Sequence, residues 1–234
     1  MSSPFAFEAP ATSAVAERTY VRQVFAWMLL GLVLTTGVAI YLNSAGNVVD
    51  YFDNHPGTFW IVFAAQLGMV FGLTLAMPRI SANAAALLFC LYAGLVGVTF
   101  SLLLAVYTTG SIVGAFAGAS GVFAGMAAYG YTTQRDLTSW GGILFGALIG
   151  LIVASIAYAF VGGTAFNLIL GYAGVIIFAG LTAYDMQKIK AIGARGAGSV
   201  ETTQKLAIFG ALALYLDFIN LVISLLRIFG GARD

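Results

Sequence analysis

The segment LAIFGALALYLDFINLVISLLRIF, residues 206–229, is long enough to cross a membrane and carries four polar side chains, Asp217, Asn220, Ser224 and Arg227. They are spaced by three, four and three residues, which places them along one face of a helix. The rest of the segment is apolar nearly all round. Such a helix is expected at the centre of a bundle, with its polar face toward a cavity. The alternative is a polar seam that joins two helices.

The composition of the whole chain is that of a membrane protein. Of its 234 residues, 61% are hydrophobic and 8% are charged, whereas soluble domains have roughly 25% charged residues. A net charge of +1 offers no basic face to nucleic acid, so this partner is excluded. The single cysteine, Cys90, cannot form an internal disulfide, and no cluster of Cys and His exists to hold zinc. We expect no cofactor.

Long uncharged runs divide the chain into membrane spans. About 20 apolar residues cross a bilayer. The uncharged stretches 80–134 and 137–184 must therefore cross twice, with breaks at YTTGS (107–111) and GGT (162–164). The predicted fold class is an all-α integral membrane protein. Its seven transmembrane helices are predicted near residues 23–42, 59–77, 84–106, 111–131, 141–161, 165–185 and 206–229.

The positions of the charges also predict domain organisation and orientation. Residues 1–22 are predicted to form a cytoplasmic polar tail, and residues 23–234 one transmembrane domain. If the N-terminus lies in the cytoplasm, eight of the ten Lys and Arg residues face the cytoplasm, and only Arg227 and Arg233 lie outside. An excess of Lys and Arg marks the cytoplasmic side of a membrane protein. The N-terminus is therefore predicted inside and the C-terminus outside.

Glycines recur at every fourth residue in two of the predicted spans. Small residues at this spacing let helix backbones approach closely in lipid. We therefore expect both sets to lie in contacts between helices, rather than along an ion path lined by glycine backbone. The first set is Gly110, Gly114 and Gly118, and the second is Gly142, Gly146 and Gly150.

Two acidic residues fall within or at the edge of the spans: Asp185 ends the sixth span, and Asp217 lies inside the seventh. A charge at mid-membrane costs about 2.5–3.5 kcal/mol on insertion scales, so such a residue normally faces a bundle interior or a wet cavity. Desolvation and mutual repulsion disfavour the state in which both carboxylates are ionised, so the two groups should titrate as a pair. Asp217 is expected roughly one to three turns deeper than Asp185. Pairing therefore requires tilt, a sixth helix that lies deeper in the membrane, or a water-filled funnel.

The acidic segments resemble the signatures of one family. Residues 180–190 read GLTAYDMQKIK, and residues 214–221 read LYLDFINL, with SLLR at 224–227. These are similar to segments of the Bax inhibitor-1 family of transmembrane proteins, bacterial branch. The resemblance covers the whole seven-helix plan. It implies a fold in which six helices wrap around a central C-terminal helix, and a location in the bacterial inner (plasma) membrane.

The same resemblance implies a function. Characterised members of the family behave as pH-sensitive calcium leak channels that are gated by a pair of aspartates. By position, this pair is Asp185 and Asp217, which would also bind Ca²⁺ weakly. Asn220, Ser224 and Arg227 would line the pore, while Arg79 is the candidate for a family arginine that latches onto the pair. The expected partners are the lipid bilayer, calcium ions and protons.

Two other functions share parts of this pattern. Intramembrane aspartyl proteases also carry a Tyr-Asp pair, which here is Tyr184-Asp185. Their second motif, Gly-x-Gly-Asp, is replaced in this chain by Leu214-Tyr215-Leu216-Asp217. We therefore do not expect an enzyme. The other function is a membrane regulator that does not conduct. Some bacterial relatives restrain an ATP-dependent membrane protease, and eukaryotic relatives modulate stress and cell-death machinery. The sequence is compatible with both the leak and the regulator.

Overall fold

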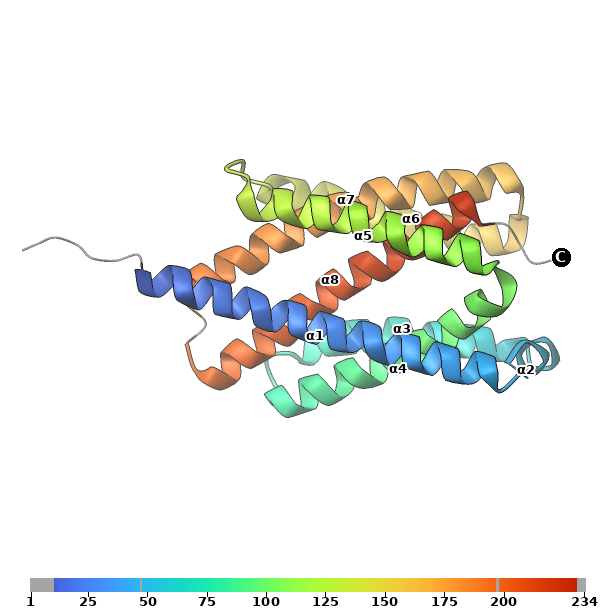
Figure 1. Ribbon diagram of the computed structural model, residues 1–234, viewed down its shortest axis with the longest axis horizontal. Coiled ribbons are helices and arrows are strands. Elements are labelled where there is room, and N and C mark those ends of the chain that lie inside the picture. The colour runs from blue at the N-terminus through green and yellow to red at the C-terminus, as the bar shows by residue number, and fades with distance from the viewer. Residues whose placement is uncertain (1–10, 47, 197, 231–234) are drawn as a thin grey trace, which may run out of the picture.

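The computed structural model describes residues 11–46, 48–196 and 198–230. The regular structure in this part of the chain is helical throughout, as Figure 1 shows. The elements are α1 (Ala11–Ser44), α2 (Val48–Asn54), α3 (Gly57–Ala76), α4 (Ala82–Val106), α5 (Thr109–Thr132), the 3-10 turn η1 (Thr138–Trp140), α6 (Gly141–Val161), α7 (Thr164–Arg195) and α8 (Val200–Phe229).

Seven of these helices are long and apolar enough to cross a membrane: α1, α3, α4, α5, α6 with the turn before it, α7 and α8. They correspond one by one to the predicted spans. The all-α fold class with seven transmembrane segments is therefore confirmed for the described residues. The remaining helix, α2, is a short element in the connector between α1 and α3.

Three helices extend beyond their predicted spans at the end of the bundle where Lys and Arg gather. Helix α1 begins at Ala11 rather than near residue 23, α7 continues to Arg195 rather than ending near 185, and α8 begins at Val200 rather than near 206. The extensions of α1 and α7 pack on one another: Tyr20 of α1 is buried, and a Cβ added to Gly193 of α7 would lie 3.1 Å from its ring. Hydropathy misses these turns because helix–helix contacts, not lipid, stabilise them.

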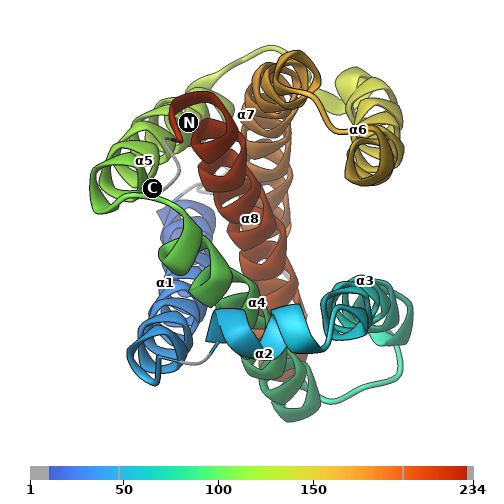
Figure 2. The same ribbon diagram turned by 90° about the vertical axis from the view of Figure 1, so that its right-hand side faces the viewer.

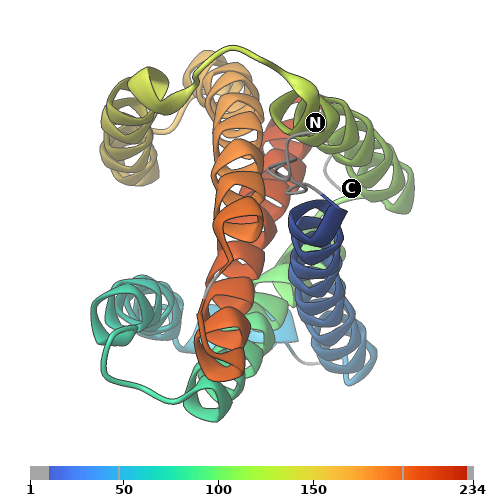
Figure 3. The same cartoon turned by 90° about the vertical axis from the view of Figure 1, so that its left-hand side faces the viewer.

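Helix α8 is the most deeply buried of the described helices. It crosses the bundle obliquely and packs against α1, α4, α5 and α7, which surround it in the two end-on views (Figures 2 and 3). Helices α3 and α6 lie at the periphery, where α3 packs on α4 and α6 packs on α7. This position suits the sequence of α8, because a helix that is apolar nearly all round can be buried on every side.

The prediction of close packing is wrong for most of the repeated glycines. A Cβ placed on Gly142, Gly146 or Gly150 would meet nothing within 4 Å, and the same holds for Gly110 and Gly114 of the first set. Helix α6 contacts α7 through larger side chains instead, since a Cβ on Gly180 of α7 would lie 2.8 Å from Leu144 of α6. Gly141 at the start of α6 is the other close glycine in this contact, because a Cβ on it would lie 2.8 Å from the ring of Tyr184 of α7. The spacing of glycines predicts a face that can pack closely, but not whether a neighbour uses it.

Candidate functional site

Asp217 is buried in the part of α8 that the other helices surround. Its side chain is 4% exposed, and its Oδ2 atom has no hydrogen-bond partner among the described residues. A buried polar atom without a partner costs free energy, and native folds retain few of them. Asp217 therefore does not stabilise the fold. An ionisable residue inside a membrane is by default a candidate functional site.

Asp185 approaches Asp217 from the neighbouring helix α7. The two carboxyl groups interact electrostatically across the α7–α8 interface. Asp185 is half-buried and lies within α7 rather than at its end, because the helix continues to Arg195. The oblique course of α8 supplies tilt, one of the three arrangements that would allow pairing (Figure 2). The structure thus brings the two predicted residues together.

Thr182 of α7 lies at the same site and was missed by the sequence analysis. It is fully buried, lies beside the carboxyl group of Asp217, and donates its hydroxyl proton to the carbonyl oxygen of Phe178 at 2.7 Å. A threonine has one hydroxyl proton, so this bond leaves none for Oδ2 of Asp217. Thr182 precedes Asp185 by three residues, and that spacing, which places both on one face of α7, was the available signal.

Two further polar residues of α8 have separate environments. Asn220 is half-buried and donates from Nδ2 to its own helix, at the carbonyl oxygen of Leu216, 2.8 Å away. Ser224 is buried against Gly174 of α7, so closely that a Cβ on this glycine would collide with the serine hydroxyl. At Ser224 the polar face forms a seam between two helices, which was the alternative to a pore.

Arg227 lies near the other end of this polar face. The centre of its guanidinium is 6.0 Å from the centroid of the Tyr158 ring of α6, and Tyr107 also lies within electrostatic range. A cation over an aromatic face is held by the ring quadrupole. Arg227 is half-buried, and it ends the polar face with a positive charge beside two tyrosines.

Arg79, the predicted latch, is exposed in the turn that joins α3 to α4. The structure does not bring it to the aspartates. Another cation reaches this turn, because Lys205 of α8 donates from Nζ to the carbonyl oxygen of Ile80 at 3.1 Å. The basic residue whose charge acts on Asp185 is Lys188, one turn further along α7.

The carboxylate pair offers few ligands for a metal ion. The described residues contain no group of three or more His, Cys, Asp or Glu side chains that could hold one. Calcium takes about six to eight oxygen ligands in a strong site. Asp185 and Asp217, even with the hydroxyl of Thr182, fall short of that number. These residues alone therefore do not form a strong calcium site.

The chain is similar to known membrane proteins along most of its length. A family model described as inhibitor of apoptosis-promoting Bax1 matches residues 17–234. The chain belongs to this Bax inhibitor family. Inner membrane protein YbhL of Escherichia coli K12 is 44% identical over 218 residues, which cover 92% of this chain and 93% of YbhL. Uncharacterized membrane protein SpyM3_0260 of Streptococcus pyogenes is 36% identical over 184 residues, 79% of each chain.

The match to the Bax inhibitor family includes all seven apolar helices and the aspartates of α7 and α8. It begins at residue 17, within the extension of α1 that hydropathy did not predict. The family and the seven apolar helices together identify the chain as a membrane protein.

Proposed function

We propose that this member of the Bax inhibitor family is a pH-sensitive leak channel for cations, calcium among them, in the bacterial inner membrane. The observation that carries the proposal is the pair of carboxyl groups at the α7–α8 interface, in which Oδ2 of Asp217 is buried and without a partner. We place the N-terminus in the cytoplasm, on the side with most of the Lys and Arg residues.

Protonation would act on the contact between α7 and α8. Two neighbouring carboxylates repel each other when both are ionised, whereas a pair that shares one proton forms a hydrogen bond. Proton uptake or release by Asp185 and Asp217 therefore changes the force between the helices. The seam at Ser224 and Gly174 holds the same helices together about two turns away, so movement would concentrate on the side of the aspartates.

The proposed ion path follows the polar face of α8 at Asp217 and Asn220 and passes beside the seam at Ser224. Asp217 supplies a negative charge, and Asn220 supplies an amide oxygen, which are ligands that calcium accepts. So few ligands suit a leak, because an ion that conducts must also be released. Arg227 opposes cations at the outer end. It must pair with an acid such as Asp234, which lies outside the described residues, or move aside.

Calcium flux into dye-loaded proteoliposomes tests the proposal. Flux through the unmodified protein should depend on pH. Asp217→Asn should lower it and weaken its pH dependence, because the variant removes one of the two ionisable groups of the pair. Asp53→Asn is the matched control, since Asp53 is exposed on α2. Ser224→Ala should also have little effect, because Ser224 lies in the seam. Unchanged, pH-dependent flux through Asp217→Asn would remove this residue from the mechanism.

A regulator that does not conduct is the second candidate. The observation that favours it is the exposure of α6 and α3. Of the residues in the most apolar stretch of each helix, 0% and 6% are buried within the chain. Both helices therefore leave long faces for another membrane protein. Its partner would be an ATP-dependent membrane protease or stress machinery. The same liposomes separate the two functions, because a pure regulator gives no flux at any pH.

A further inference from the structure

Two side chains of α7 bind the backbone where α5 ends and the connector to α6 begins. Gln187 donates from Nε2 to the carbonyl oxygen of Arg135 at 2.8 Å and accepts from the backbone N–H of Leu137, also at 2.8 Å. Lys190 donates from Nζ to the carbonyl oxygen of Tyr131 at 2.8 Å, and the same ammonium lies 5.0 Å from the centroid of the Tyr131 ring. We call these contacts of Gln187 and Lys190 the α7 clamp.

The α7 clamp lies on the side of α7 that is opposite to Asp185. Successive residues of a helix are about 100° apart, so Gln187 and Lys190 lie roughly 200° and 140° around the axis from Asp185. Ala183 faces the same way as the clamp, and a Cβ added to Gly130 of α5 would lie 2.9 Å from its Cα atom. One side of α7 is therefore held against α5, while the other side presents Asp185 to α8.

Helix α5 is in turn packed on α8 next to Asp217. The ring of Phe218, the residue after Asp217, lies against Phe123 and Phe116 of α5, with centroid distances of 5.6 and 6.1 Å. Aromatic pairs at such distances add favourable contacts to their burial. Because α5 contacts α8 beside one aspartate and α7 behind the other, it links the positions of the two.

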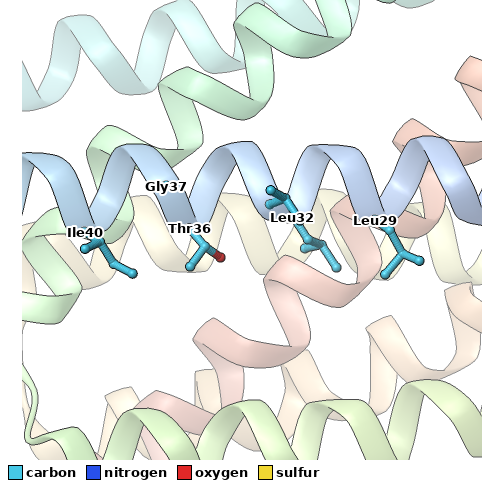
Figure 4. Close-up of a pocket in the computed structure, with 6 residues that line it drawn as sticks. Leu29, Leu32, Thr36, Gly37 and Ile40 are labelled. Carbon is cyan, nitrogen blue, oxygen red and sulfur yellow. The ribbon is translucent and has the colours of Figure 1, made fainter.

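Helix α1 gives α5 less support at this level. The two helices meet at the rings of Phe25 and Phe123, whose centroids are 6.5 Å apart. Beyond this contact α1 carries an open apolar groove of about 410 Å³ between Leu29 and Ile40, shown in Figure 4. The position of α5 therefore depends on its contacts with α7 and α8.

Lipid by itself does not fix the position of α7 along its axis. The helix has 32 residues and is about 48 Å long, whereas a hydrocarbon core is about 30 Å thick. A helix that is longer than the core adjusts by tilting at modest cost. The hydrogen bonds of the α7 clamp form at one position only. A shift of α7 by one turn would leave the N–H of Leu137, a buried residue, without its acceptor, and such a loss costs free energy.

We propose that Gln187 and Lys190 are positioning residues, which fix the register and rotation of α7 and so place Asp185 opposite Asp217. The consequence for ion flux rests on the proposed leak, whereas the position of α7 can be measured without it. A clamp that only anchored the connector would act differently. It would hold residues 133–140 in place and leave α7 where α8 and the lipid put it.

Pulsed electron paramagnetic resonance of the full-length protein in lipid nanodiscs measures the register of α7. In a Cys90→Ala background, nitroxide labels are attached at Ala194→Cys near the end of α7 and at Asn83→Cys near the start of α4. Both positions are exposed and lie outside the clamp. The chain with an intact clamp should give one narrow distance distribution. Gln187→Ala/Lys190→Met should broaden it by about 5 Å or add a second distance, because neighbouring turns of a helix are about 5 Å apart.

The matched control replaces the same kinds of side chain in the connector, as Gln134→Ala/Arg135→Met. Both side chains are exposed, and the variant keeps the backbone carbonyl that Gln187 binds. It should give the distribution of the intact clamp. Lys190→Arg should do the same, because arginine retains a donor for the carbonyl of Tyr131. The single variants Gln187→Ala and Lys190→Met should each broaden the distribution less than the double variant, and they carry the test if the double variant does not fold.

Calcium flux into proteoliposomes tests whether the clamp acts through Asp185. If Gln187 serves to place Asp185, its loss has no further effect once that carboxyl is absent. Flux through Asp185→Asn/Gln187→Ala should then equal flux through Asp185→Asn to within about twofold, whereas independent effects would add. Effects that add would contradict an action through Asp185.

Two results of the distance measurement would overturn the proposal, whatever the flux. An unchanged, narrow distribution in Gln187→Ala/Lys190→Met would show that α7 keeps its register without the clamp. Equal broadening in Gln134→Ala/Arg135→Met would indicate a general effect of altering the connector. If the unmodified protein conducts no calcium, the proposed leak is contradicted, while broadening that occurs only without the clamp still supports the positioning of α7.

Discussion

The hydroxyl groups of Thr35 and Tyr215 lie 2.6 Å apart in the buried centre of the bundle and link α1 to α8. Thr35 also donates to the carbonyl oxygen of Ala93 of α4 at 2.9 Å. A threonine hydroxyl has one proton, so Tyr215 must be the donor in the bond between them. Three helices that are distant in sequence therefore meet at one ordered set of hydrogen bonds.

The direction of this bond predicts unequal effects of two substitutions. Thr35→Val should destabilise the protein by about 2 kcal/mol, because it leaves the buried hydroxyl of Tyr215 without an acceptor. Tyr215→Phe should cost about 1 kcal/mol or less, because Thr35 keeps its bond to Ala93. Thermal unfolding in detergent measures both. A larger loss in Tyr215→Phe would show that the donor has been assigned the wrong way round.

Two glycines of the bundle should respond in opposite ways to alanine. A Cβ on Gly130 of α5 would lie 2.9 Å from the Cα atom of Ala183 of α7, and backbone cannot move aside cheaply. Gly130→Ala should therefore cost about 1–3 kcal/mol. Gly146→Ala should be neutral or stabilising by up to about 1 kcal/mol, because its Cβ meets nothing and alanine favours the helix. Unfolding in detergent compares them directly.

Arg79, the predicted latch, should matter less than the two aspartates. Arg79 is exposed, whereas Asp185 acts on Asp217 at the interface of α7 and α8. Arg79→Ala is therefore expected to change the pH dependence of calcium flux less than Asp185→Asn does. An equal or larger effect of Arg79→Ala would indicate that its side chain reaches the pair in a conformation other than this one.

Cysteine labelling tests the proposed orientation. In a Cys90→Ala background, Asp136→Cys in the connector after α5 should react with membrane-impermeant maleimide only from the cytoplasm. Asp53→Cys on α2 should react only from outside, because one span separates the α2 connector from the N-terminus. Both positions are exposed. The reverse pattern would invert the topology.

The connector before α6 provides a prediction about pH. Hydrogen bonds from the hydroxyl group and backbone N–H of Thr138 lower the pKa of Asp136, whose Oδ1 lies 2.9 Å from the Thr138 nitrogen. A carboxyl whose pKa is lowered by folding stabilises the fold above its ordinary pKa, and this contribution is lost as pH falls through the lower value. Protection of the Thr138 amide from hydrogen exchange should therefore fall only in acid. Asp136→Ala should remove that acid transition.

Much of the candidate site was predictable, because the cost of an ionisable group in lipid restricts where one is found. The charge pattern of α7 and α8 identified Asp185 and Asp217 before their contact was known. It could not identify which polar residues share their surroundings. Ser224 shares the stripe of α8 with Asp217 but lies in a seam, while Thr182, on another helix, lies beside the carboxyl. Such differences depend on how one helix is rotated against the next.

The sequence by itself determined that the chain is a membrane protein with seven spans, because hydropathy and charge act on each segment independently of its neighbours. The tertiary structure alone decided the oblique course of α8, the extra turns of α1 and α7, and the exposure of Arg79. It also decided that Gly130 is in close contact while Gly146 meets nothing. The physical reason is that tilt, rotation and helix length beyond the lipid depend on the fit between side chains from distant segments, which no single segment contains.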